Sequence, residues 1–513
     1  MKHKNSLVQG ALLLTIAGFL TRIIGFFYRI FLSRTIGAEG MGLYQLIFPI
    51  YGIVSSISIA SVQTSISRYV AAEQSAGRKK GSKNTLLAGV FLSLSVTTLL
   101  SAVVYFNAEW LAIEFLKESR CIDLVKILAF SLPFSSIHSC INGYYYGIQK
   151  ATVPSISQLA EQIIRVLCVY VMSMISLSET GTISTKIAVA GVVIGEAASM
   201  LFCVFSIVLH FGKQNTRTNE VNSSLAVPGF IKQLKNIFAF SLPLSFNRLL
   251  LSVLHSIEAV LIPIQLRLFG MSDSDAISLF GVFTGMAMPF IQFPSAIPNA
   301  IAVLLLPEVA AAAELSTTDK EMSKRKLSRS SENGIRYSVL LGILCIGIFV
   351  VFGNDMGIII FNNKLAGIYI TILAWLCPFL YLSTTLGSIL NGLSETTAPF
   401  IHSVISILIR LVFVFFAIPK YGIVAYLIGT LVSQIVMTGL HYFKVQKKVS
   451  LQLNAMRLIV WPTLILFISL FVALTISMVI SLIALPPIII LGVKCAIAGL
   501  VYIALIYFFK LLN

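Results

Sequence analysis

Long apolar runs separated by short polar breaks follow one another along almost the whole chain. A helix needs about 20 mostly apolar residues to cross the hydrocarbon core of a bilayer, and most of the runs reach that length. About fourteen runs meet this criterion, with centres near residues 21, 54, 96, 135, 166, 198, 248, 289, 343, 380, 408, 432, 468 and 498. The pattern predicts an all-α polytopic membrane protein with about 14 transmembrane helices.

The composition excludes a soluble globular protein. Hydrophobic residues make up 57% of the 513 residues and charged residues only 11%, a balance typical of membrane proteins. The first apolar run follows a basic start, as in a signal peptide. It lacks a small-x-small cleavage site and continues past Arg22, so we expect it to remain as the first transmembrane helix.

The cysteines and the net charge predict neither a metal site nor a nucleic-acid partner. The seven Cys lie in or beside apolar runs without a CxxC spacing, which argues against a metal site and against a disulfide framework. The net charge is +17, but the basic residues lie mostly in short loops and form no basic stripe interleaved with aromatic residues. No cofactor is expected.

Lys and Arg are distributed unevenly between alternate loops. Loops on the side of the N-terminus hold about three times as many as loops on the other side, and the positive-inside rule then places both termini in the cytoplasm. The longest polar segment, residues 314–336, lies on that cytoplasmic side. We expect it to be a solvated hinge between two halves of the protein, with contact to anionic lipids as a second role.

An internal repeat relates the two halves of the chain. Ile127–Phe134 reads ILAFSLPF, and 245 residues further on Ile372–Phe379 reads ILAWLCPF. Further matches in the same order are Pro154 with Pro399, Arg165 with Arg410, Asn142-Gly143 with Asn391-Gly392 (if a gap of four residues is allowed), Arg34 with Arg267, and Gly37 with Gly270. The repeat predicts a six-helix N-terminal lobe over residues 1–212, a six-helix C-terminal lobe over 213–450 and two additional helices over 451–513.

The repeat has a functional implication. An even number of spans in each half means that both halves cross the membrane in the same direction. Parallel repeats of this kind occur in transporters whose substrate site lies between the halves near the bilayer midplane.

Several arginines lie inside the apolar runs. A charge at the centre of a membrane helix costs at least about 2.5 kcal/mol, so such residues are expected to have a function or a partner. Arg22 and Arg29 are two helical turns apart and share one face of the first helix. Arg248 opens the matching helix of the second half, and Arg410 matches Arg165. Because the guanidinium group suits phosphate, the surplus of arginine predicts an anionic substrate.

The acidic residues inside the runs allow two interpretations. Glu161 and Arg165 are four residues apart on one helix and are expected to neutralise each other. Glu161 and Glu258 could instead take part in Na⁺ or H⁺ coupling. For Arg22 and Arg29, the alternative to a substrate site is pairing with Glu258 or with Glu196 from other spans.

The first two spans resemble a known family. Residues 21–51, TRIIGFFYRIFLSRTIGAEGMGLYQLIFPIY, and the 6+6+2 layout are similar to the stage V sporulation protein B branch of polysaccharide transporters. This branch belongs to the MOP superfamily, which also contains the lipid II flippase MurJ and the MATE drug exporters. The resemblance implies a V-shaped pair of lobes, alternating access, arginines of span 1 that hold a lipid diphosphate, and a groove for the isoprenoid tail formed by the last two spans.

The match to the MurJ pattern is partial. Arg22 and the following Gly25-Phe26 match its Arg-x-x-Gly-Phe motif. The next MurJ arginine falls on Tyr28, whereas this chain has Arg29, one residue or about 100° further around the helix. The shift favours the sporulation branch over MurJ itself.

The resemblance and the arginines together predict a flippase that is not an enzyme. We expect it to move an undecaprenyl-diphosphate-linked precursor of peptidoglycan or another polysaccharide, similar to lipid II, from the inner to the outer leaflet of the bacterial cell membrane. Cell-wall synthesis and sporulation are the expected processes, membrane lipids the further partners, and a monomer the expected state. The alternatives are a MATE-like exporter of small molecules and, in another class, a membrane-embedded glycosyltransferase or polymerase that would use carboxylates such as Glu109, Glu114, Asp273 and Asp275.

Overall fold

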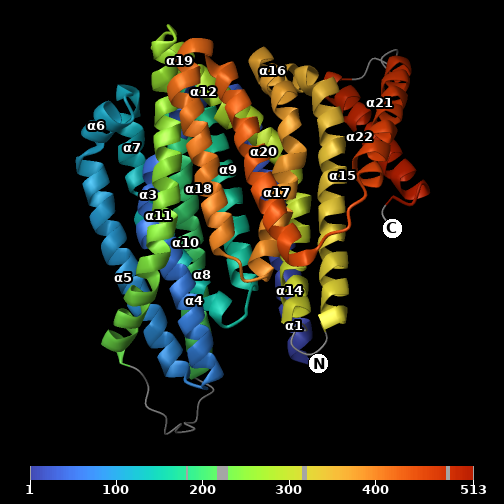
Figure 1. Cartoon of the computed structure of the whole chain (residues 1–513). Helices are drawn as coiled ribbons and strands as arrows, with labels where there is room; N and C mark the ends of the chain where they lie inside the picture. Colours follow the sequence, from blue (N-terminus) through green and yellow to red (C-terminus); the bar gives the residue numbers. More distant parts are fainter. Residues whose placement is uncertain (1, 181–182, 216–228, 315–319, 481–485, 512–513) are drawn as a thin grey trace. The chain divides into compact units, whose positions relative to one another are not determined.

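The computed structural model describes residues 2–180, 183–215, 229–314, 320–480 and 486–511, and these residues form helices and short connections without a strand (Figure 1). Fourteen helical segments among them are long and apolar enough to cross a membrane. Each of the predicted centres lies within one of these segments. The predicted fold class is therefore confirmed.

The chain divides into two compact units, residues 1–264 and 265–513. The first unit contains most of Phe230–Leu268 (α11), a helix that the predicted repeat assigns to the second lobe. Helix α11 packs against Phe48–Ser58 (α3), another helix of the first unit. Ser245 and Ser256 of α11 donate hydrogen bonds to the carbonyl oxygens of Ile57 (3.0 Å) and Pro49 (3.3 Å). The two compact units therefore divide near the end of α11. The predicted boundaries at residues 212 and 450 divide the sequence repeats rather than the compact units, and they stay a prediction.

The membrane helices of the first unit are interrupted at several points, and proline marks one of them. Pro49 stands at the start of Phe48–Ser58 (α3), where its missing N–H leaves no intrahelical bond unmade. The helices of this unit are Lys2–Thr35 (α1), Gly37–Leu46 (α2), Phe48–Ser58 (α3), Ala60–Ser75 (α4), Lys79–Phe106 (α5), Ala108–Trp110 (α6), Ile122–Ala129 (α7), Ser131–Gly147 (α8), Thr152–Thr180 (α9), Thr185–Asn215 (α10) and Phe230–Leu268 (α11).

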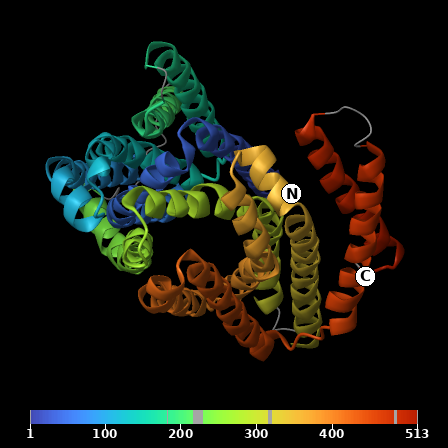
Figure 2. The same cartoon turned by 90° about the horizontal axis from the view of Figure 1, so that it is seen from above.

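The second unit has the same character. Its helices are Asp273–Gly281 (α12), Met288–Gln292 (α13), Ala296–Glu314 (α14), Lys320–Phe361 (α15), Lys364–Leu373 (α16), Cys377–Gly392 (α17), Thr397–Val412 (α18), Ile418–Tyr421 (α19), Ile423–Val449 (α20), Trp461–Ile480 (α21) and Pro487–Phe508 (α22). Figure 2 shows α21 and α22 beside α15. Tyr502 of α22 is buried there and donates a hydrogen bond to the carbonyl oxygen of Leu340 (3.1 Å).

The backbone of each unit carries the repeat. Residues with a positive φ recur 245 residues apart as Lys117 (53°) with Asn362 (52°) and Gln149 (59°) with Ser394 (60°). Gly37 and Gly270, matched from the sequence, also have positive φ values of 70° and 103°. Because such dihedral angles are rare outside glycine, their recurrence supports the repeat independently of the side chains.

The structure corrects one detail of the repeat. A Cβ on Gly147 would lie 2.7 Å from the Ser67 carbonyl oxygen, and a Cβ on Gly392 would lie 3.0 Å from the Leu306 carbonyl oxygen. Both glycines end equivalent helices, and they are 245 residues apart. Gly392 therefore corresponds to Gly147 without the four-residue gap that was used to match it with Gly143.

The expectation of a solvated hinge over residues 314–336 is wrong for the part that the structure describes. Helix α15 begins at Lys320, and its charged first turns run straight into the transmembrane part. Small and apolar residues at helical spacing, Ser323, Leu327, Ser331 and Ile335, are buried. Ser323 donates a hydrogen bond to the Ala312 carbonyl oxygen on α14 (2.6 Å). The segment is therefore an amphipathic helix whose exposed face carries the charged residues. Residues 315–319 lie outside the described residues.

Helices α15 and α16 approach each other at two glycines. A Cβ on Gly357 would lie 2.0 Å from the Gly367 backbone nitrogen, and a Cβ on Gly367 would lie 2.8 Å from the Asn354 Cα atom. These neighbours are backbone atoms, so they cannot move aside as a side chain could. Small residues at such crossings allow close packing of membrane helices.

We expect Gly367→Ala to destabilise the protein by about 1–3 kcal/mol, the usual cost of overpacking. Gly439→Ala on α20 is the matched control, because no atom lies within 4 Å of the added Cβ and alanine favours a helix over glycine by about 1 kcal/mol. Thermal unfolding of both variants in detergent measures the difference. Equal stability of the two variants would show that the α15–α16 contact is not this tight.

Candidate functional site

A buried ion pair lies on α9. Arg165 Nη2 donates a hydrogen bond to Glu161 Oε1 at 2.5 Å, and the two side chains are only 14% and 15% exposed. Because residues four apart on a helix lie on one face, this pair was expected from the sequence, and it is confirmed. It removes most of the cost of either charge within the membrane.

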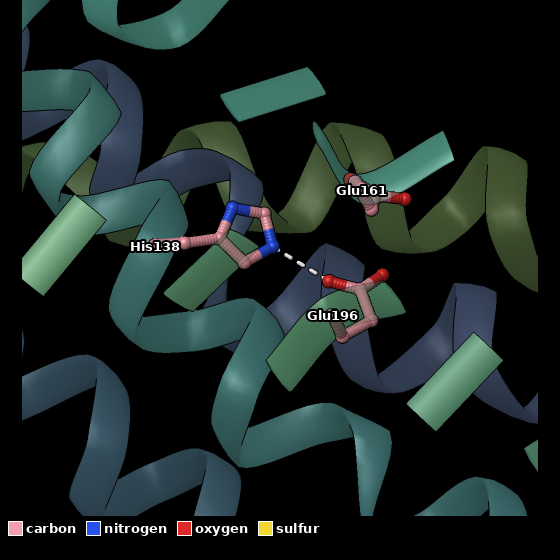
Figure 3. Close-up of side chains that lie close together, drawn as sticks. All are labelled: His138, Glu161 and Glu196. Carbon is pink, nitrogen blue, oxygen red and sulfur yellow. Dashed lines mark hydrogen bonds and ion pairs between the residues drawn. The ribbon is translucent and has the colours of Figure 1, made fainter. Parts of the chain in front are cut away.

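A second pair lies next to the first. His138 Nε2 of α8 lies 2.6 Å from Glu196 Oε2 of α10, and Figure 3 shows the imidazole ring directed at this carboxylate with Glu161 close by. The hydroxyl of Tyr51 on α3 donates to the other oxygen, Glu196 Oε1, at 3.1 Å, and lies 2.9 Å from the Ser135 hydroxyl. One nitrogen or oxygen atom from each of His138, Glu161 and Glu196 lies within 4.8 Å of the others. We call Tyr51, His138, Glu161, Arg165 and Glu196 the charge cluster.

Glycine on α10 makes room for the charge cluster. A Cβ on Gly195 would lie 3.1 Å from Arg165 Nε and 3.1 Å from the Glu161 carbonyl oxygen. A side chain at this position would therefore push α9 and α10 apart and move Arg165. The glycine next to Glu196 allows the Glu161–Arg165 pair and the His138–Glu196 pair to lie in one place.

Three ligand atoms of the cluster are close enough to meet at one cation, and no other group of three His, Cys, Asp or Glu in the described part of the chain meets this criterion. His138 would supply a nitrogen, and Glu161 and Glu196 an oxygen each. However, Arg165 already holds Glu161, and both oxygens of Glu196 accept hydrogen bonds. The cluster thus contains its own cation.

The predicted arginines of α1 are not part of this cluster. Arg29 interacts electrostatically with Tyr28 and Tyr44, and Arg165 acts on the same two tyrosines. Arg22 is exposed and Arg29 is half-buried. Within the part of the chain that the structure describes, neither has a hydrogen bond or an ion pair. Glu196, one of their expected partners, binds His138 and Tyr51 instead.

The other predicted site residues have contacts of their own. Arg248 on α11 donates to the Thr64 hydroxyl on α4 (3.3 Å). Glu258 is buried and lies 3.5 Å from His255 Nδ1. Arg410 belongs to the second unit, where it donates to the Ser406 hydroxyl (3.5 Å). The assignment of Arg22, Arg29, Arg248 and Arg410 to substrate binding stays a prediction.

Sequence reasoning missed His138 and Tyr51. A signal for His138 was present, because Ser131, Ser135, His138 and Asn142 recur at helical spacing within an apolar span. All four are buried. A polar stripe of this kind on a membrane helix faces other helices rather than lipid. No local pattern distinguishes Tyr51 from the other tyrosines of the first spans.

Three of the four carboxylates considered for an enzyme, Glu114, Asp273 and Asp275, have partners at the surface of their own unit. Glu114 pairs with Lys117 at 2.8 Å on an exposed turn of the first unit. Asp273 pairs with Arg267 and Asp275 with Ser272, both in the second unit. Glu109, the fourth of these carboxylates, is exposed as well.

Comparison with known proteins places the chain in a family. The family described as polysaccharide biosynthesis protein matches residues 7–296. Stage V sporulation protein B of Bacillus subtilis (strain 168) is 25% identical over 453 residues, which cover 86% of this chain and 84% of that protein. The chain is a multi-pass membrane protein that belongs to the polysaccharide biosynthesis protein family.

Solved structures agree on the fold. The lipid II flippase MurJ in an inward closed conformation aligns with a TM-score of 0.64 at 14% identity, covering 98% of this chain and all of that one. A multidrug resistance MATE transporter of the MOP superfamily in an inward-facing conformation aligns with a TM-score of 0.63 at 14% identity, covering 84% of this chain and 94% of that one. At this level of identity the two structures show that the chain shares their fold.

Proposed function

We propose that the protein is a flippase for an undecaprenyl-diphosphate-linked precursor of peptidoglycan or another polysaccharide, similar to lipid II. The observation that carries the proposal is the pair Arg22 and Arg29 on α1, two cations of a membrane helix with no acidic partner among the described residues. Arg29 interacts electrostatically with Tyr28 and Tyr44, and we propose that their hydroxyls add hydrogen bonds to a bound anion. The relatives named above, a sporulation protein and a lipid II flippase, support this class of substrate.

In this mechanism the arginines hold the diphosphate while the isoprenoid tail stays in the lipid. Guanidinium groups offer paired donors that match phosphate oxygens. Arg248 and Arg410 are the proposed contacts from the second repeat. A small cationic drug, the usual cargo of a MATE-like exporter, would be repelled by the same groups, so the surplus of arginine favours the flippase.

The membrane potential can drive the transport. In a cell that is negative inside, each negative charge carried fully outward gains about 2.3 kcal/mol per 100 mV. The emptied cationic site is drawn inward by the same field, so no cofactor is needed. We propose that both termini are cytoplasmic, that the protein acts as a monomer, and that Na⁺ or H⁺ coupling is the alternative source of energy.

Genetic replacement tests the proposal. The gene is expressed in a bacterial strain whose essential lipid II flippase can be switched off, and growth and the exposure of lipid II on the outer leaflet are measured after depletion. We expect growth and exposure to persist with this gene and to stop with an empty vector. Incubation of the purified protein with lipid II is the control for an enzyme, because a flippase leaves the lipid chemically unchanged. Lack of exposure from a well-expressed protein would exclude lipid II as the substrate.

A further inference from the structure

The two units differ where the second and third segments of each repeat meet. In the first unit this junction, between α4 and α5, encloses a buried acid. Glu73 is 5% exposed and accepts hydrogen bonds from Arg78 Nε (2.7 Å) and Nη2 (3.1 Å) and from Gln233 Nε2 on α11 (3.1 Å). A Cβ on Gly81 of α5 would overlap the Glu73 carboxylate. The acid therefore occupies the space that the missing side chain of Gly81 leaves.

Packing contacts identify the equivalent junction of the second unit, between α14 and α15. The side chain of Ile66 lies against Gly89 in the first unit, and that of Leu305 lies against Gly334 in the second. Ile66 and Leu305 are 239 residues apart, and Gly89 and Gly334 are 245 residues apart. The two carbonyl oxygens that lie against the matched glycines of α8 and α17 are also 239 residues apart. The register of both helix pairs is thereby fixed.

This register shows that the chemistry of the junction is inverted in the second unit. Ala312 takes the position of Glu73, and Lys326 takes the position of Gly81. The junction contains a cavity of about 400 Å³ whose lining includes Ala312, Lys326, Arg329, Glu308, Ser330 and Asn333. An acid packed against a glycine in one unit is thus replaced in the other by a cavity with basic residues in its wall.

Two cations and one acid line this cavity. Lys326 and Arg329 of α15 are exposed, and neither forms an ion pair among the described residues. Glu308 of α14 accepts a hydrogen bond from the Ser330 hydroxyl at 2.5 Å with one oxygen, and the other oxygen has no partner in the described part of the chain. The net charge of the lining is therefore +1. Guanidinium and ammonium groups together suit a phosphate, and the second Glu308 oxygen suits a donor close to that phosphate.

The cavity lies at the depth of the lipid headgroups and just beyond it. Arg336 precedes the apolar run of α15 that is long enough to cross a membrane. Asn333 and Lys326 are three and ten residues before Arg336, or about 5 and 15 Å along the helix axis. The headgroup layer of a bilayer is about 5–8 Å thick on each side. A phosphate can therefore reach the cavity from a lipid headgroup, and from solution as well.

We propose that this cavity is a binding site for a phosphate ester, with Lys326 and Arg329 on the phosphate and Glu308 accepting a hydrogen bond from a hydroxyl of the same ester. The positive lining and the depth favour an anionic phospholipid with a hydroxyl-bearing headgroup, such as phosphatidylglycerol, over a free ester. The site belongs to the second unit alone and does not rest on the proposed function.

Native mass spectrometry of the full-length protein in an uncharged, phosphate-free detergent tests the site with short-chain dihexanoyl phosphatidylglycerol. We expect Lys326→Gln combined with Arg329→Gln to weaken binding by at least about tenfold, because hydrogen bonds from both charged donors are lost. Lys324→Gln combined with Arg325→Gln is the matched control, since it removes the same charge from exposed positions of the same helix outside the cavity lining. Absence of binding to the unmodified protein, or equal weakening in both double variants, would overturn the site.

Two further ligands identify the source of the phosphate. Glycerol phosphate has the same polar groups without the acyl chains, and we expect it to bind more weakly than the lipid. Equal affinities, with the same loss in the cavity variant, would assign the site to a soluble ester and overturn the preference for a lipid. Phosphatidylcholine has no donor in its headgroup and should also bind more weakly than phosphatidylglycerol. Equal binding of these two lipids would remove Glu308 from the site.

The variant Ala312→Glu tests the origin of the cavity. It returns the acid of the first unit to the equivalent position, where we expect the new carboxylate to pair with Lys326 and weaken the binding of phosphatidylglycerol by at least about tenfold. Thermal unfolding in the same detergent shows whether this buried substitution is tolerated. Full binding by a folded Ala312→Glu variant would contradict the comparison of the two junctions.

Discussion

Replacing Arg22 and Arg29 together by alanine is expected to reduce the outer-leaflet exposure of the lipid-linked precursor by at least about tenfold. Hydrogen bonds to charged groups contribute about 1.5–3 kcal/mol each, which corresponds to about ten- to a hundredfold in affinity. The folded protein should lose nothing, because neither arginine has a protein partner among the described residues. Exposure of the precursor in a strain that depends on this gene measures the effect, and the amount of protein in the membrane is measured in parallel.

Two further variants separate charge from geometry. Substitution of both arginines by lysine keeps the charge but loses the paired donors of guanidinium, so we expect partial activity. Arg325→Ala is the matched control, because this arginine is exposed and its pair with Glu321 spans 3.4 Å at the surface. Full exposure in the double alanine variant would remove Arg22 and Arg29 from the substrate site.

Breaking the ion pair of α9 is expected to have the largest effect on stability. Arg165→Met leaves Glu161 buried without its cation, and loss of one partner of a buried pair costs about 3–5 kcal/mol. The double variant Glu161→Gln with Arg165→Met should recover most of this loss, because it removes both charges of the pair together. Thermal unfolding of the unmodified protein, Arg165→Met and the double variant in the same detergent measures the difference in stability.

The exposed pair Arg325–Glu321 again serves as the control. Its replacement should change the stability by no more than about 1 kcal/mol, as for other surface pairs. If Arg165→Met were as stable as the double variant, Glu161 would have another partner or would take up a proton in place of the guanidinium, and the pair would not be the main support of the cluster.

The spans could be predicted because their length is set by the bilayer and their boundaries by polar loops. The same reasoning wrongly predicted a hinge at residues 320–336. The buried face of α15 there contains serine and glycine besides apolar residues, so the sequence shows no clear apolar stripe among the charged residues. In that segment tertiary packing against α14, through contacts such as Ser323 to Ala312, decides the structure.

The site shows the same division between local and distant contacts. Glu161 and Arg165 could be paired from the sequence because helical geometry brings residues four apart together. His138 and Glu196 are 58 residues apart, and their contact depends on how α8 and α10 pack. Without the glycine at position 195 that packing would not bring Arg165 to the same place. Single-sequence patterns contain no direct information on such contacts.

The length of α15 has a mechanical consequence. Its 42 residues span about 63 Å at 1.5 Å per residue, about twice the hydrocarbon thickness of a bilayer. The charged first turns continue the transmembrane part without a break, so this stretch acts as a stiff lever. A 10° tilt of α15 would displace the tip of a 25 Å arm by roughly 4 Å. A spectroscopic label near the exposed Lys324 would therefore magnify small helix movements during transport into distances that can be measured.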